Sequence, residues 1–135
     1  MRRFHALLLM TALAVTTSAF VACGGGSSEP APVDVTPSTE LKLVAKNSKF
    51  DKKSLATIPM SDVVLILDNR DAGTLHNFAV YRTSDGKGKV FGGDLFAGRK
   101  SVEYRFRSPE QGVYYFRCDA HPEMKGTFTV KPASN

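Results

Sequence analysis

Short apolar segments separated by turn residues fill residues 40–135, and this pattern limits the chain to a few folds. Residues 101–106 alternate polar and apolar side chains, and residues 63–67 form a continuous apolar run that begins with two valines. Turn-forming residues such as Ser84, Asp85 and Gly86 separate such runs. About seven or eight short strands in a segment of this length indicate an all-β fold, a Greek-key antiparallel β-sandwich.

The pattern also makes predictions for three particular segments. Residues 75–81 and 113–118 are predicted strands, and in the second a period of two puts Tyr114, Phe116 and Cys118 on one face. Residues 94–100 have no clear pattern and could hold a short helical turn.

The first 22 residues are typical of an export signal. Arg2 and Arg3 give a basic start, and residues 6–15 are apolar. An apolar run of about ten residues is too short to remain as a membrane-spanning helix. We therefore expect residues 1–22 to be a cleaved signal peptide.

Residues 23–39 are expected to link this signal to the folded part. Gly, Ser and Pro dominate after Cys23, a composition typical of a flexible tether. Ala22-Cys23 resembles the lipobox of bacterial lipoproteins, in which the cysteine becomes the first mature residue and carries lipid. The resemblance implies lipidation at Cys23 and attachment of the domain at 40–135 to the outer face of a bacterial membrane, periplasmic or at the cell surface.

The two cysteines of the chain are therefore expected to have different roles. If Cys23 carries lipid, Cys118 has no disulfide partner. An exported protein meets an oxidising environment, so a lone thiol needs another use, and metal ligation is one.

Cys118 opens a segment that offers three kinds of metal ligand. The sequence CDAHPEM places a thiolate, an imidazole and a thioether at Cys118, His121 and Met124. The chain has three histidines; His5 lies in the predicted signal, so His76 is the remaining imidazole.

The softness of these ligands selects the metal. A thiolate, two imidazoles and a weak thioether suit copper, whereas zinc rarely recruits methionine. An iron–sulfur cluster needs several cysteines, and a binuclear copper site needs two in this loop. The residues therefore predict one copper ion that cycles between Cu(I) and Cu(II).

Two stretches carry a resemblance to the cupredoxins, the blue type 1 copper proteins, and to their plastocyanin- and amicyanin-like members. They are LHNFAVY (75–81) and YYFRCDAHPEMKGTFTV (114–130). The resemblance implies a cupredoxin-like sandwich and implies that Asn77 ties its strand to the ligand loop near Asp119. It also implies four copper ligands: His76, Cys118, His121 and Met124.

The ligand set leaves no open coordination position and no base beside it, so we expect electron transfer and no enzymatic activity. The alternative is an extracytoplasmic copper-binding or delivery module, although delivery sites usually expose clusters of Met or His. The electron donor and acceptor stay open among a c-type cytochrome, a quinol-oxidising complex, a dehydrogenase and an oxidase.

Charge adds a weaker indication about partners. The chain carries 18 basic and 13 acidic residues, a net charge of +5. This balance suits an acidic partner or an anionic surface. The basic residues are scattered along the sequence, so we interpret them as a solvated surface and expect no nucleic-acid binding. We expect a monomer.

Overall fold

Alternation along the strands gives each sheet one buried face. In strand β4 (Asp62–Asn69), Val63, Leu65 and Leu67 are buried, and the residues between them are partly exposed. The period of two puts every second side chain on the same face of a strand. The computed structural model describes residues 35–133; the predicted signal peptide and Cys23 lie outside this range.

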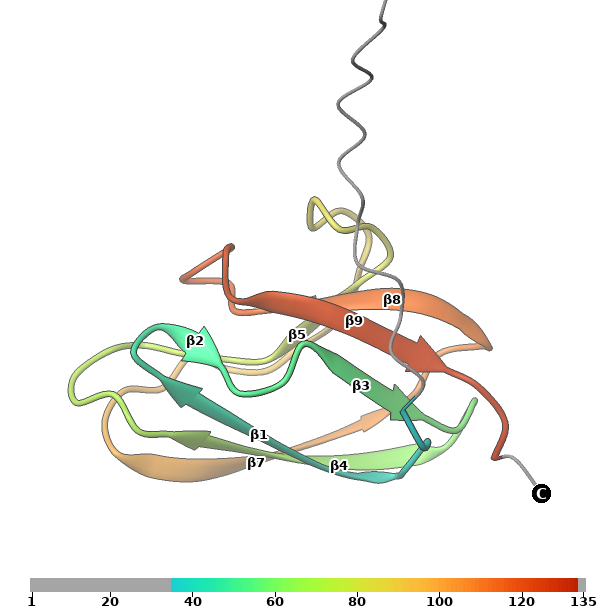
Figure 1. The fold of residues 1–135 in the computed structure, drawn as a ribbon, viewed down its shortest axis with the longest axis horizontal. Coiled ribbons are helices and arrows are strands. Elements are labelled where there is room, and N and C mark those ends of the chain that lie inside the picture. The colour runs from blue at the N-terminus through green and yellow to red at the C-terminus, as the bar shows by residue number, and fades with distance from the viewer. Residues whose placement is uncertain (1–34, 134–135) are drawn as a thin grey trace, which may run out of the picture.

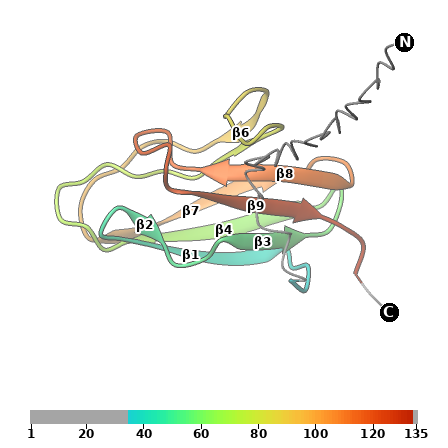
Figure 2. The same cartoon turned by 45° about the horizontal axis from the view of Figure 1, so that its top comes forward.

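Two facing sheets make up the described part of the chain (Figures 1 and 2). The first sheet has the order β2-β1-β4-β7, with β1 at Glu40–Lys46, β2 at Lys49–Phe50 and β7 at Lys100–Arg107. The second has the order β3-β9-β8-β5-β6. Its strands are β3 (Ser54–Thr57), β5 (Ala79–Tyr81), β6 (Lys89–Gly92), β8 (Gly112–Arg117) and β9 (Lys125–Val130).

The predicted all-β sandwich is confirmed, and its sheets prove to be mixed. Strands β1 and β4 pair in parallel, as do β3 and β9, while the other pairs are antiparallel. The chain leaves the first sheet after β2, adds β3 to the second sheet and returns as β4, so neighbours in space are not neighbours in sequence. Residue alternation identifies strands and carries no information on their relative direction.

Two segments near the ligands differ from the sequence prediction. The apolar pattern of residues 75–81 predicts one strand, but only Ala79–Tyr81 forms one. Residues 94–100, for which a short helical turn is a possible prediction, contain no helix. The two segments meet at a single antiparallel bridge between His76 and Phe96, with backbone hydrogen bonds of 3.1 and 3.0 Å. Around this bridge the side chains of Asn69 and Asn77, in place of a neighbouring strand, donate to backbone carbonyls.

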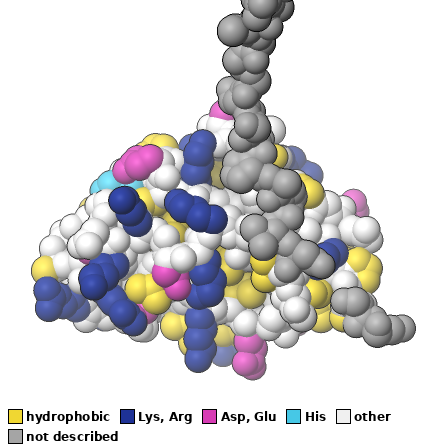
Figure 3. Space-filling view, viewed as in Figure 1, with side chains coloured by type: hydrophobic (Ala, Val, Ile, Leu, Met, Phe, Trp, Pro, Cys, Tyr) yellow, Lys and Arg dark blue, Asp and Glu magenta, His cyan; other side chains and the backbone are white. Residues whose placement is uncertain are grey.

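Long connections gather at one end of the sandwich, the left end in Figure 1. Three segments lie here: 70–78 and 93–99 cross from one sheet to the other, and 118–124 joins β8 to β9 within the second sheet. His121 lies in segment 118–124 and is partly exposed, whereas His76 is fully buried. Figure 3 shows histidine surface at this end. Within residues 35–133 no helix is long and apolar enough to cross a membrane.

An aromatic cluster fills the space between the sheets behind this end. Phe78 is fully buried, and its ring centroid lies 5.7 Å from that of Phe116, 6.0 Å from Phe106 and 6.2 Å from Phe128. These rings come from both sheets, so Phe78 joins the sheets at the centre of the core.

Replacing Phe78 with alanine is expected to lower the free energy of unfolding by about 3–5 kcal/mol, through lost burial and the cavity that remains. Denaturant titration of the purified domain measures this loss. Val113→Ala is the control, because Val113 is 49% exposed and its loss should change stability by no more than about 0.5 kcal/mol. Similar effects of the two substitutions would contradict the central role of Phe78.

Candidate metal centre

The loop between β8 and β9 folds three predicted ligands back on themselves. The backbone N–H of Cys118 donates to the carbonyl oxygen of Met124, and the N–H of Met124 donates to that of His121, both at 2.9 Å. The side chains of Cys118 and Met124 are buried, 0% and 1% exposed, and His121 is half-buried. The short loop therefore fixes its ligands by its own backbone hydrogen bonds.

His76 reaches the same point from a different part of the chain. It precedes β5, and the backbone bridge to Phe96 fixes its position. Its Nδ1 lies 3.8 Å from Cys118 Sγ, and Nδ1 of His121 lies 3.7 Å from the same sulfur. One ligand atom from each of the three residues lies within 4.8 Å of the other two.

These separations fit a shared metal ion. Bonds of about 2.1 Å to nitrogen and 2.3 Å to sulfur, about 120° apart, place the two donor atoms about 3.8 Å from each other. Both sulfur–nitrogen distances in the structure agree with this value. With Met124 buried in the same cluster, the four residues form a type 1 copper-like site, since thiolate, imidazole and thioether together suit copper.

Asp71 belongs to this site, although its place in the sequence indicates only a turn. Its Oδ2 lies 2.9 Å from His76 Nε2, and its side chain is 12% exposed. A carboxylate partner holds the proton of the imidazole on Nε2 and leaves the lone pair of Nδ1 for the metal. Nδ1 is the nitrogen that faces Cys118.

The same carboxylate holds the turn between β1 and β2. It accepts hydrogen bonds from the backbone N–H groups of Asn47 (2.6 Å) and Ser48 (2.9 Å). Both residues have positive φ, 53° and 52°, as a two-residue hairpin turn of type I′ requires. The bond from Ser48 is the largest influence that lowers the pKa of Asp71, although partial burial opposes it. Asp71 thus joins the first hairpin to a ligand of the metal centre.

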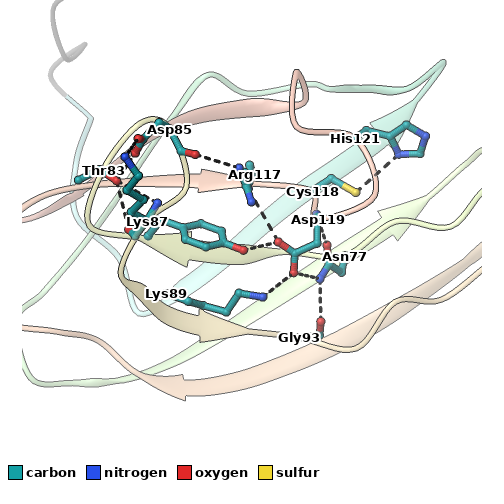
Figure 4. A network of polar contacts seen from close by, with 11 residues as sticks. Asn77, Thr83, Asp85, Lys87, Lys89, Gly93, Arg117, Cys118, Asp119 and His121 are labelled. Atoms are coloured by element: carbon teal, nitrogen blue, oxygen red, sulfur yellow. Dashed lines mark hydrogen bonds and ion pairs between the residues drawn. The ribbon is translucent and has the colours of Figure 1, made fainter.

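Asn77 and Asp119 lie on the other side of the ligands, in direct contact with each other. The N–H of Asp119 donates to Asn77 Oδ1 at 2.7 Å, and Asn77 Nδ2 donates to Asp119 Oδ2 at 3.0 Å and to the carbonyl of Gly93 at 2.8 Å. Because Asp119 directly follows Cys118, this pair fixes the backbone that carries the thiolate. Figure 4 shows both residues beside Cys118.

Asp119 also anchors a polar network along β5, β6 and β8 (Figure 4). Its carboxylate accepts a short hydrogen bond from Tyr81 and pairs with Lys89 Nζ at 2.9 Å. The guanidinium of Arg117 lies over the Tyr81 ring, 4.4 Å from its centroid. Burial raises the pKa of Asp119, but the hydrogen bonds from Tyr81 and Lys89 outweigh it and hold the pKa below its usual value.

Sequence reasoning therefore named the four residues that the structure brings together and, through the resemblance, the contact between Asn77 and the region of Asp119. It missed Asp71, Tyr81 and Lys89. The signal for Asp71 was weak. A carboxylate five residues before a histidine has no periodicity that marks a contact. Only the folded loop brings its Oδ2 to the imidazole.

No protein-family model matches the sequence, and no curated protein matches it. Solved structures do match. An auracyanin from Roseiflexus castenholzii, described as reduced by dithionite, is 20% identical, with a TM-score of 0.62 over 71% of this chain and 99% of its own. Auracyanin A from Chloroflexus aurantiacus, described as a blue copper protein, is 20% identical, with a TM-score of 0.59 over 68% of this chain and 98% of its own.

Rusticyanin from Thiobacillus ferrooxidans has a TM-score of 0.55 at 19% identity and covers 70% of this chain and 79% of its own. At these identities the likeness concerns the backbone, and it spans nearly the whole length of both auracyanins. Together with the two mixed sheets and the ligand loop between the last two strands, it shows that the chain has the cupredoxin fold.

Proposed function

We propose that the chain is a mononuclear type 1 copper protein that carries single electrons between redox partners outside the cytoplasm. The observation that carries the proposal is the convergence of His76 Nδ1, Cys118 Sγ and His121 Nδ1 within 4.8 Å beside buried Met124. Copper, when bound, supplies the one-electron couple. The similarity to auracyanin A, a blue copper protein of the same fold, supports this choice of metal.

The chain itself contributes rigidity and exclusion of water. Cys118, His76 and Met124 are at most 1% exposed, and backbone hydrogen bonds hold both segments that carry the ligands. A donor set held in nearly fixed positions needs little rearrangement when the charge at its centre changes by one. That property favours electron transfer over bond-making chemistry, so we propose no enzymatic activity.

Electrons would enter and leave at His121, the ligand with exposed surface. Leu75 and Leu95 flank the His76–Phe96 bridge and are 47% and 45% exposed. Copper delivery is the weaker alternative, because a thiolate and a thioether this deeply buried offer an acceptor no direct access.

The proposal about where the protein is located rests on Cys23, which lies outside the described residues. We propose that lipid on Cys23 anchors the exported domain to the outer face of a bacterial membrane, with residues 24–39 as a tether. A c-type cytochrome, a quinol-oxidising complex, a dehydrogenase or an oxidase would then supply or accept the electron.

The metal assignment is tested by visible spectroscopy of the copper-loaded protein. One Cu(II) per chain should give an intense charge-transfer band, and Cys118→Ser should abolish it because the thiolate is its source. Met124→Leu is the matched control: it removes a weak axial ligand and should shift the band without abolishing it. A full-strength band in Cys118→Ser would overturn the assignment.

The role of Asp71 is tested by the reduction potential. Its negative charge on the His76 imidazole should stabilise the more highly charged oxidised state. Asp71→Asn should lower the Cu(II)-to-Cu(I) affinity ratio about tenfold, which raises the potential by about 59 mV. Asp68→Asn is the control, because this carboxylate pairs with Arg70 on the surface. An equal rise in both variants would show a general charge effect.

Anchoring is tested by detergent phase partitioning of the protein purified from cells. The wild type should enter the detergent phase and Cys23→Ser the aqueous phase, while Cys118→Ser should behave as the wild type does. Aqueous partitioning of the wild type would mean that the protein is exported without lipid.

A further inference from the structure

We propose that an acidic redox protein docks on a basic groove beside the metal centre. The proposal rests on the proposed electron-transfer function and names the class of partner. The groove, of about 590 Å³, lies at the ligand end of the first sheet. Its lining has four cationic side chains and one carboxylate: Lys46, Arg70, Arg99, Lys100 and Asp68.

Strand register brings these cations together from three separate parts of the sequence. Asn69 on β4 lies opposite Ala45 on β1 and opposite Lys100 on β7. Each of the other three cations lies one residue from these paired positions: Lys46 ends β1, Arg70 directly follows β4 and Arg99 directly precedes β7. The basic residues that look scattered along the sequence therefore form a row across the end of the sheet.

This row is only partly neutralised within the described part of the chain. Asp68 pairs with Arg70 at 2.7 Å, whereas Lys46 and Arg99 form no ion pair with a carboxylate of residues 35–133. Asp71, the nearest other carboxylate in sequence, is turned inward to His76. Like charges on adjacent strands repel each other and lower stability, so the remaining positive charge suits a surface that an anionic partner completes.

The opposite end of the same sheet has its charges balanced. Arg105 pairs with Glu103 at 2.5 Å, and Arg107 lies 3.8 Å from Asp62. The excess of positive charge is therefore a property of the ligand end. Figure 3 shows Lys and Arg side chains at the end where His121 surfaces.

A short path of hydrogen bonds connects the groove to a ligand. Asn69 Nδ2, from the groove lining, donates to the carbonyl oxygens of Thr74 (2.9 Å) and Phe96 (3.4 Å). The Phe96 carbonyl also accepts the N–H of His76. A partner held by the groove would thus lie at the end of the molecule where electrons leave, and opposite charges would steer it there.

One observation favours a protein over a lipid surface. Leu75 and Leu95 are 47% and 45% exposed and flank the His76–Phe96 bridge, to which Asn69 of the groove lining is hydrogen-bonded. Exposed apolar side chains next to a charged region give the apolar centre and charged rim of a protein interface.

The test compares two double variants with the same change in charge. Lys46→Glu/Arg99→Glu reverses the groove, and Arg105→Glu/Arg107→Glu reverses the balanced end. An acidic c-type cytochrome is the probe, with stopped-flow electron transfer at low and high ionic strength as the readout. We expect the groove variant to lose about tenfold in rate at low ionic strength and most of its salt dependence. The control variant should lose much less.

A second readout does not require copper. Chemical-shift mapping of the metal-free mature chain with the same cytochrome should perturb the amides of Lys46, Arg70 and Arg99. If these shifts appear while the copper-loaded chain transfers no electron, the proposed function fails and the docking site stands. Equal rate losses in both variants, no shifts at the groove, or shifts only with phosphatidylserine vesicles would each overturn the docking proposal.

Discussion

The contact between the His76 ring and the Asp71 carboxylate sets most of the local structure at the metal centre. A fully buried imidazole needs partners for both ring nitrogens. Asp71 accepts a hydrogen bond from Nε2–H, and Nδ1 faces Cys118. Because the carboxylate also binds the N–H groups of Asn47 and Ser48, it couples the ligand to the first hairpin of the fold. The position of one ligand therefore depends on strands that contribute no donor atom.

The sequence alone predicted those features that depend on the pattern of neighbouring residues, namely strand faces and the spacing of the residues in the ligand loop. Alternation in residues 113–118 predicted that Tyr114, Phe116 and Cys118 share one face, and all three side chains are buried. The ligand types and the spacing of Cys118, His121 and Met124 pointed to copper. What the sequence could not supply were contacts made by folding: the bridge from His76 to Phe96 and the pairing of β1 with β4 join residues 20 or more positions apart.

The same distinction explains the errors near the ligands. The apolar pattern of residues 75–81 predicts a strand throughout, but its first half is held as a loop by side-chain hydrogen bonds. Asn69 binds the Thr74 carbonyl, and Asn77 binds the Gly93 carbonyl. Buried amides with partners distant in sequence override the local β preference here. Two buried asparagines thus convert a potential strand into the segment that carries His76.

Asp68 and Asp71 lie three positions apart in the sequence and have different proposed functions. Asp68 lies at the surface and offsets one cation of the basic groove, so in the proposed docking it would act on encounter with a partner. Asp71 faces inward and contacts the imidazole, so in the proposed function it would act on the relative stability of the two oxidation states. Charges on the surface are screened by salt and by water, whereas a charge in hydrogen-bond contact with a buried ligand is screened much less. Substitutions at Asp68 and at Asp71 should therefore change the rate of encounter with a partner and the reduction potential independently.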